Sequence, residues 1–181
     1  MASEQAQLVE GDVRLRPWTM GDVERLVQVG DDHDIWLNLR DRFPHPFTTP
    51  AAQLWLADQV AEIDPPMSFA IEWRGDLVGG VRLKRREDAH HVCADLTFWL
   101  GREYWGQGIA LGAVRAATAH AFEGLGLERV QAFVYDWNPT AARVLEHAGF
   151  KLEGRLRNYV KKDDRLGDAL LYARLRGEAA P

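Results

Sequence analysis

The chain has 181 residues, of which 46% are hydrophobic, and a formal net charge of −5 from 27 acidic and 22 basic residues. This length suits one packed domain over residues 1–181, the acidic balance disfavours a nucleic-acid partner, and no apolar run reaches the ~20 residues of a membrane span. The single cysteine, Cys93, excludes an intramolecular disulfide, and residues 1–5 lack the basic and apolar regions of a signal peptide, so we expect a cytoplasmic protein.

The N-terminal third of the sequence predicts one strand followed by three helices. Alternating apolar residues indicate the strand, which Pro17 ends, and Thr19 with Asp22 resembles a capping box at the start of the first helix. Thr48 and Pro50 mark the start of the third helix, because proline is tolerated in a first helical turn. The predicted elements are a strand at 13–16, a helix ending at Gly30, a short helix at 35–39 and a helix from Thr48 to about Ile63.

The remaining sequence predicts strands interrupted by two helices. Gly75 and Asp76 indicate the turn of a hairpin, residues 84–88 are charged and indicate a solvated turn, and Gly149 ends the last helix. The predicted strands are 69–73, 77–83, 90–100, 129–135, 150–159 and 168–174, and the helices are 109–124 and 139–148. This order predicts an α+β fold in which helices flank a mixed, mostly antiparallel sheet with one or two parallel crossovers.

A glycine-rich turn, Trp105–Ala110, joins the strand at 90–100 to the helix that follows it. The first turn of a helix presents free backbone N–H groups and the positive end of the helix dipole, so it attracts anionic oxygens. A Rossmann fingerprint does not fit this turn, because Gly106, Gly108 and Gly112 are spaced GxGxxxG. The Gly-Lys-Ser/Thr tripeptide of a P-loop does not occur in the sequence.

The turn resembles motif A of the GNAT superfamily of N-acetyltransferases, in which Gln/Arg-x-x-Gly-x-Gly/Ala at the mouth of a helix holds the pyrophosphate of acetyl-coenzyme A. Gly108 and Ala110 match the last two fixed positions, and Trp105 stands where the family usually has Gln or Arg. The run Tyr104–Ala110 is similar to the branch of ribosomal-protein N-terminal acetyltransferases (RimJ/RimL-like). The resemblance implies the GNAT, or acyl-CoA N-acyltransferase, fold.

A second run strengthens this resemblance, because two motifs at the right separation are more specific than either alone. Asn138–Phe150, followed by Glu153–Arg157, is similar to the N-x-x-S-x-x-V-x-E-K-x-G-F…E-G-x-L-R signature of the same branch. Asp168 and Tyr172 also stand where that branch places an Asp and a Tyr in its last strand.

The resemblance implies a site for the cosubstrate acetyl-CoA. The backbone of Phe98–Leu100 would pair with the pantetheine arm, Asn138 would bond the pantetheine or acetyl end, and Arg143 is a candidate for the phosphates. Asn138 also suits a helix cap before Pro139, and the alternative for Arg143 is a solvated helix charge. The predicted cofactor-binding residues are Phe98, Trp99, Leu100, Trp105, Gly106, Gln107, Gly108, Ile109, Ala110, Asn138 and Arg143.

The implied reaction is direct attack of a neutral amine on the acetyl thioester. Asp95 is the candidate base, at a position where the family often carries Glu. An ordinary carboxylate is a poor base for an ammonium, so Asp95 would need burial or a bridging water, and the alternative is a strand Asp that pairs with an Arg. Leu145 and Ala141 stand where many relatives have a Tyr or a Ser near the leaving thiolate, so water, Tyr104 or Tyr159 would have to protonate it.

Asp31, Asp32 and Asp34 are the candidate acceptor-binding residues, because the resemblance places the first two helices and their loop beside the acceptor channel. Three carboxylates within four positions repel one another and attract cations, although they could also merely solvate a helix end. The expected acceptor is therefore a basic peptide N-terminus, and the alternative is a small amine such as a polyamine, an aminoglycoside or an amino-acid analogue.

Two further functions remain as alternatives to an enzyme of this kind: a non-catalytic acetyl-CoA-binding module and a nucleotide-binding protein. No metal is expected, because the six histidines show no metal-ligand spacing. We expect a monomer or a homodimer with no membrane partner.

Overall fold

The computed structural model describes residues 8–61 and 65–179. Residues 1–5, which carry the expectation that no signal peptide is present, lie outside the described residues, as does Ile63, the predicted end of the third helix. None of the described helices is both long and apolar enough to cross a membrane.

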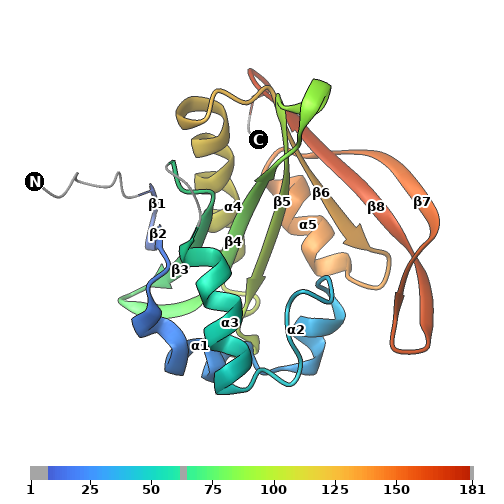
Figure 1. Ribbon diagram of the computed structural model, residues 1–181. Helices are drawn as coiled ribbons and strands as arrows, with labels where there is room; N and C mark the ends of the chain where they lie inside the picture. The colour runs from blue at the N-terminus through green and yellow to red at the C-terminus, as the bar shows by residue number, and fades with distance from the viewer. Residues whose placement is uncertain (1–7, 62–64, 180–181) are drawn as a thin grey trace, which may run out of the picture.

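Within the described residues, eight strands form one sheet in the order β1-β2-β3-β4-β5-β6-β8-β7 (Figure 1). Every neighbouring pair is antiparallel except β5 and β6, which are parallel. The predicted mixed, mostly antiparallel sheet is therefore confirmed. The strands are β1 (Leu8–Glu10), β2 (Val13–Pro17), β3 (Ser68–Trp73), β4 (Asp76–Arg85), β5 (Cys93–Leu100), β6 (Arg129–Tyr135), β7 (Lys151–Lys162) and β8 (Arg165–Leu175).

Helices cover both faces of this sheet, and each face has its own apolar cluster. On one face α1, α2 and α3 pack with the loop at 38–47 around Trp18, Phe47 and Trp99. On the other face α4 and α5 pack against the sheet through Ile109 and Leu145, among others. The helices are η1 (Met20–Asp22), α1 (Val23–Gly30), α2 (His33–Leu37), α3 (Thr49–Val60), η2 (Asp88–His90), η3 (Arg102–Tyr104), α4 (Ile109–Ala119), the π-helical η4 (His120–Gly124) and α5 (Pro139–His147).

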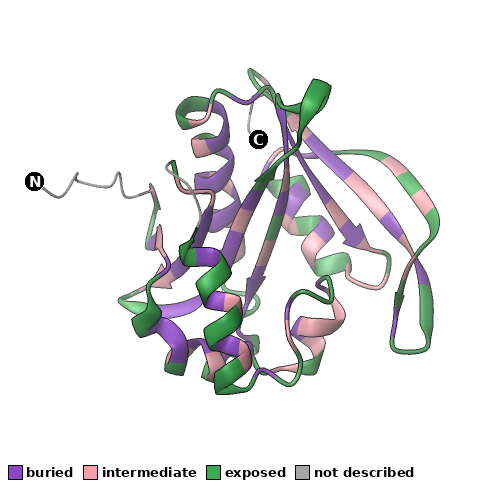
Figure 2. Cartoon of the chain, viewed as in Figure 1, coloured by how far each residue is buried: buried purple, intermediate pink, exposed green. Residues whose placement is uncertain are grey.

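The strands differ from the prediction where they are exposed and charged. β1 was not predicted, β4 continues through Lys84 to Arg85 instead of ending at 83, and β5 begins at Cys93 after the short helix η2. β7 and β8 also extend further, to Lys162 and from Arg165, than the predicted 150–159 and 168–174. β7 is largely exposed (Figure 2), so its sequence lacks the apolar alternation that marks a half-buried strand.

The parallel pair β5 and β6 separates along its length. Its register covers only Cys93–Asp95 of β5 against Arg129–Gln131 of β6. Beyond these residues β5 still pairs with β4, and β6 still pairs with β8, on their outer edges. The inner edges of residues 96–100 and 132–135 therefore present backbone groups to the gap between them.

Candidate functional site

A cleft of about 570 Å³ lies where β5 and β6 separate. Its walls are the diverging halves of the two strands, the glycine-rich turn and the beginning of α5. Ten of the predicted cofactor residues line it: Phe98, Trp99, Leu100, Trp105, Gly106, Gln107, Gly108, Ile109, Ala110 and Asn138. Arg143 does not line the cleft, because its side chain lies on the exposed face of α5.

The glycine-rich turn aims the N-terminus of α4 at this cleft. Gly106 and Gly108 have φ angles of 74° and 78°, a conformation that L side chains rarely adopt. A Cβ atom added at Gly108 would meet no atom within 4 Å, so the backbone faces open space there. The helical hydrogen bonds begin with Gly112, whose N–H donates to the Gly108 carbonyl at 3.2 Å. The earlier amides of the 11-residue helix are left for an anionic group.

Trp105 and Gln107 hold the turn in place from within. The indole Nε1 of Trp105 donates to the Leu100 carbonyl at 2.9 Å, and Gln107 Nε2 donates to the Glu103 carbonyl at 3.0 Å. Trp105 is 43% exposed and the Arg102 guanidinium lies 5.5 Å from its ring centroid. Trp105 therefore stabilises the turn from the position at which the motif usually has Gln or Arg.

Asn138 caps α5 while it lines the cleft, because its Oδ1 accepts from the Ala141 N–H at 3.2 Å. The side-chain amide N–H groups of Asn138 are donors that this cap does not use. The other residues of the second signature act within the fold: Arg155 bonds Asp168 at 2.5 Å, and the Tyr172 hydroxyl donates to Glu146 at 2.9 Å. Burial, reinforced by Glu146, raises the pKa of Tyr172 to about 12.

The cleft also carries polar groups that the sequence did not single out. The indole Nε1 of Trp137 and the Oδ1 of Asn38 are buried and lack hydrogen-bond partners among the described residues. Arg165, whose guanidinium stacks 4.5 Å from the Trp137 ring centroid, and His147 also line the cleft. A long, narrow molecule with an anionic end and amide groups along its length matches this set of donors and free strand edges. The pantetheine and pyrophosphate of coenzyme A have that chemistry.

The acetyltransferase (GNAT) domain family matches the chain over residues 12–151. The chain belongs to this family. The match confirms the predicted fold and family, that of the acetyltransferase (GNAT) domain. Among the described residues, no three His, Cys, Asp or Glu side chains gather as a metal site would require.

Relatives of this GNAT chain fall into two groups by their names. It is 31% identical to the ribosomal-protein-serine acetyltransferase of Escherichia coli (strain K12) over 107 residues, 59% of each chain. It is 26% identical to the spermidine N(1)-acetyltransferase of the same strain over 144 residues, 80% of this chain and 75% of the relative. The chain spans about half the length of three other curated relatives: the alignments cover 52%, 56% and 47% of those proteins.

Among solved structures, Mycobacterium smegmatis RimJ in complex with CoA-disulfide superposes with a TM-score of 0.82 at 25% identity. The alignment covers 97% of this chain and 90% of RimJ. These relatives are consistent with the predicted RimJ/RimL-like branch and leave the acceptor of the GNAT chain open.

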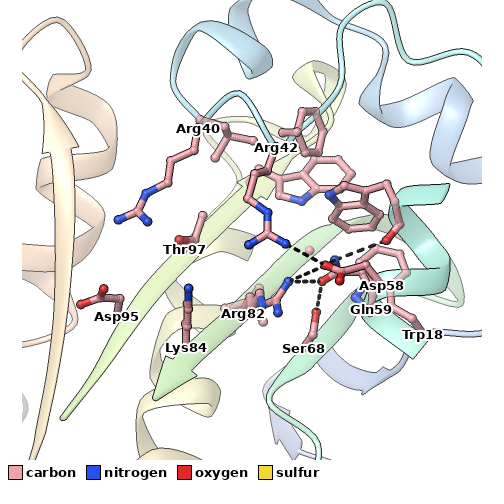
Figure 3. A pocket seen from close by; sticks show the side chains of 16 residues that line it. Trp18, Arg40, Arg42, Asp58, Gln59, Ser68, Arg82, Lys84, Asp95 and Thr97 are labelled. Carbon is pink, nitrogen blue, oxygen red and sulfur yellow. Dashed lines mark hydrogen bonds and ion pairs between the residues drawn. The ribbon is translucent and has the colours of Figure 1, made fainter. Parts of the chain in front are cut away.

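A second cavity of about 140 Å³ adjoins the cleft, and Leu39, Thr97 and Trp99 line both (Figure 3). Asp95 lies in this second cavity, on the same face of β5 as Thr97 and Trp99. Its carboxylate accepts from Gln131 Nε2 at 2.8 Å and from Arg86 Nε at 3.2 Å. These contacts match the alternative considered for Asp95, in which it is a strand carboxylate paired with an arginine. The role of Asp95 as a base stays a prediction.

That Asp31, Asp32 and Asp34 attract a cationic acceptor stays a prediction, although all three carboxylates have partners in the fold. Asp31 Oδ1 accepts from the Phe47 N–H at 2.8 Å. Asp32 caps α2 and pairs with Arg102 at 3.1 Å, and Asp34 also pairs with Arg102. Sequence proximity suggested repulsion, whereas each carboxylate has a partner distant in sequence, the Phe47 amide or Arg102. Only Asp34 lines the cleft, and none of the three lines the second cavity.

Two tyrosines of the GNAT chain line the cleft, Tyr104 and Tyr135. Tyr104 was a predicted candidate, and its hydroxyl accepts from Arg25 at 2.5 Å. The other predicted candidate, Tyr159, is 55% exposed, stacks on Phe133 and does not line the cleft. Sequence analysis missed Tyr135, because nothing distinguished it from the other aromatic residues of a β strand.

Tyr135 is suited to donate a proton. Its hydroxyl makes no hydrogen bond with the residues that the structure describes. Burial raises the pKa of Tyr135 above its ordinary value, although the nearby Arg40 guanidinium opposes this shift. The phenol therefore keeps its proton throughout the neutral range. Leu145, in contrast, is fully buried in the core and presents no group to the cleft.

Proposed function

We propose that this chain transfers the acetyl group of acetyl-CoA to the α-amine of a peptide or protein N-terminus. One observation carries the proposal: the free inner edges of β5 and β6 lead into the glycine-rich turn at the N-terminus of α4. This arrangement offers strand-like hydrogen bonds to a pantetheine arm and backbone amides to a pyrophosphate. The likeness to the ribosomal-protein-serine acetyltransferase supports a protein N-terminus as the acceptor.

The residues around the two cavities divide the chemistry between them. Bound acetyl-CoA supplies an acetyl thioester, which a neutral amine can attack directly. Asp95 takes a proton from the incoming ammonium, directly or through one water, from its place in the second cavity. Tyr135 donates the hydroxyl proton to the departing thiolate, the role for which Leu145 and Ala141 have no suitable group. Thr97 and Trp99 separate these two proton transfers, since both line the boundary between the cavities.

Two alternatives compete with this function. A non-catalytic acetyl-CoA-binding module was suggested by the missing Tyr and Ser, and the hydroxyl of Tyr135 in the cleft weakens that argument. A polyamine acceptor is supported by the likeness to the spermidine N(1)-acetyltransferase. The second cavity opposes it, because Arg40, Arg42, Arg82 and Lys84 are among its lining residues and would repel a polycation.

The test is a thiol-release assay with acetyl-CoA and three kinds of amine. We expect release with a peptide that has a free N-terminus, and mass spectrometry should place the acetyl group on the α-amine. The matched control is the same peptide with a blocked N-terminus and an internal lysine, which should release no thiol. Turnover of spermidine without turnover of any peptide would establish the polyamine alternative instead.

Tyr135→Phe is expected to lower kcat by about tenfold, at the low end of general-acid effects because a thiolate is already a good leaving group. The affinity for acetyl-CoA, measured by calorimetry, should stay within about twofold of wild type because the ring remains in place. Tyr159→Phe is the matched control, since that residue lies outside the cleft, and it should keep the wild-type rate. An unaltered kcat in Tyr135→Phe would leave water as the proton donor.

A further inference from the structure

Most of the charged residues that line the second cavity are cations. Among its described lining residues are four basic side chains, Arg40, Arg42, Arg82 and Lys84, and two acidic ones, Asp58 and Asp95. The chain as a whole is acidic, with a net charge of −5, so this concentration of positive charge is local to the cavity. It adjoins the cleft through Leu39, Thr97 and Trp99, so a molecule bound in it would lie next to the acetyl-CoA proposed for the cleft.

The two carboxylates in the cavity are already paired. Asp58 Oδ2 contacts Arg42 at 3.5 Å and Arg82 at 3.4 Å, as the dashed lines in Figure 3 mark. Asp95 pairs with Arg86, outside the cavity lining, and with the amide of Gln131. The acidic groups therefore have partners within the protein and leave the other two cations uncompensated.

Arg40 and Lys84 make no side-chain hydrogen bond or ion pair with any residue that the structure describes. Figure 3 shows both side chains pointing toward the space beside Thr97 and Asp95, Arg40 from the loop after α2 and Lys84 from β4. Two cations that converge on one space from different elements form a site for an anion, because each would repel the other without one. Lys84 lies directly opposite Asp95 in the β4–β5 register, so that anion would sit next to the candidate base.

Four aromatic rings form another part of the cavity wall. Phe43 packs edge-on against Trp99 with ring centroids 5.0 Å apart, and Trp18 packs against Trp55 at 5.3 Å. All four rings line the cavity. A ligand that fits this space has a short apolar stem and a charged end, as an acidic amino-acid residue does. The negative charge of Asp95 favours a monoanion over a phosphate dianion.

We propose that the acceptor is an amine that also carries a carboxylate, and that Arg40 and Lys84 bind that carboxylate. The carboxylate comes either from an acidic side chain close to a peptide N-terminus or from the α-carboxyl group of a free amino acid. The proposal rests on the acetyl-transfer function proposed above and names its substrate class. It replaces the cationic acceptor expected from Asp31, Asp32 and Asp34.

The first experiment compares peptides that differ only at their second residue, which is Glu, Gln or Lys. We expect thiol release with a kcat/KM about tenfold higher for Glu than for Gln, the size of one charge-assisted contact at a partly exposed site. The preference should shrink in 1 M salt, because screening weakens the attraction. Equal rates for Glu and Gln, or a preference for Lys, would overturn the proposal.

The second experiment assigns the preference to the two cations. In the Arg40→Gln/Lys84→Gln double variant we expect the ratio of Glu to Gln rates to fall close to one, while calorimetry gives an unchanged affinity for acetyl-CoA. The matched control is Arg157→Gln/Lys161→Gln, which removes the same two charges from exposed positions of β7 outside both cavities and should keep the wild-type ratio. A double variant that keeps the wild-type ratio would contradict the assignment.

A third arm separates this proposal from the function on which it rests. Free glutamine is compared as an acceptor with its α-carboxamide, which carries no carboxylate. If free glutamine is acetylated, its amide is not, and no peptide is, the carboxylate proposal stands while the peptide acceptor fails. If peptides are acetylated with no regard to charge, the proposed function stands and the carboxylate proposal fails.

Discussion

Gly108→Asp is expected to abolish measurable binding of acetyl-CoA while the protein remains folded. Gly108 is the N-cap residue of α4, and a side chain there would occupy the open space that the turn faces. Its carboxylate would also satisfy the free amides of the helix and repel a pyrophosphate. We expect the dissociation constant to rise by at least ~100-fold, which is about 2.7 kcal/mol.

The fold should survive this substitution, because its effects on the free energy of unfolding are confined to the turn and the first turn of α4. Asp tolerates a positive φ better than most residues, and a carboxylate at a helix N-cap is favourable. Gly126→Asp is the matched control: Gly126 has a φ of 65°, a Cβ there would also meet open space, and the residue lies outside the cleft. Calorimetry should show wild-type affinity for the control. Equal affinity in Gly108→Asp would place the phosphate site elsewhere.

The cofactor cleft could be predicted from sequence because its determinants are local. A strand, a glycine-rich turn and an amphipathic helix occupy consecutive residues, and the positive φ of Gly106 and Gly108 follows from the residue type. Asn138 was predicted for the same reason, as the residue before Pro139 at a helix start. The sequence suggested two roles for Asn138, a helix cap and a residue of the cofactor site. In the structure Asn138 caps α5 and also lines the cleft.

The second cavity could not be predicted, because its residues come from segments without a pattern. Arg40 lies in an irregular loop, and Lys84 was assigned to a solvated turn although it belongs to β4. The partners of Asp31 and Asp32, the Phe47 amide and Arg102, are 16 and 70 positions away, beyond any local periodicity. Local sequence therefore could not show that these carboxylates have partners in the fold.

Asp95→Asn is expected to lower kcat by roughly 10²–10⁴-fold, the usual effect of losing a general base, with little change in the affinity for acetyl-CoA. The substitution is nearly isosteric, so the amide oxygen can still accept from Gln131, and the side chain stays in the second cavity. What it removes is the negative charge that can take a proton from the ammonium of the acceptor. The rate should be measured from pH 6 to 9, where the acceptor amine itself changes its protonation.

The ion pair with Arg86 provides the control that separates a base from a structural carboxylate. Arg86→Gln leaves the charge of Asp95 in place but removes the cation that holds it at 3.2 Å. If Asp95 only pairs with Arg86, each substitution breaks the same contact, and both variants should lose similar, small amounts of stability and activity. If Asp95 is the base, Arg86→Gln should keep most of the rate, because the carboxylate is still in place, whereas Asp95→Asn should lose it. A rate for Asp95→Asn equal to that of Arg86→Gln across the pH range would reduce Asp95 to a structural residue.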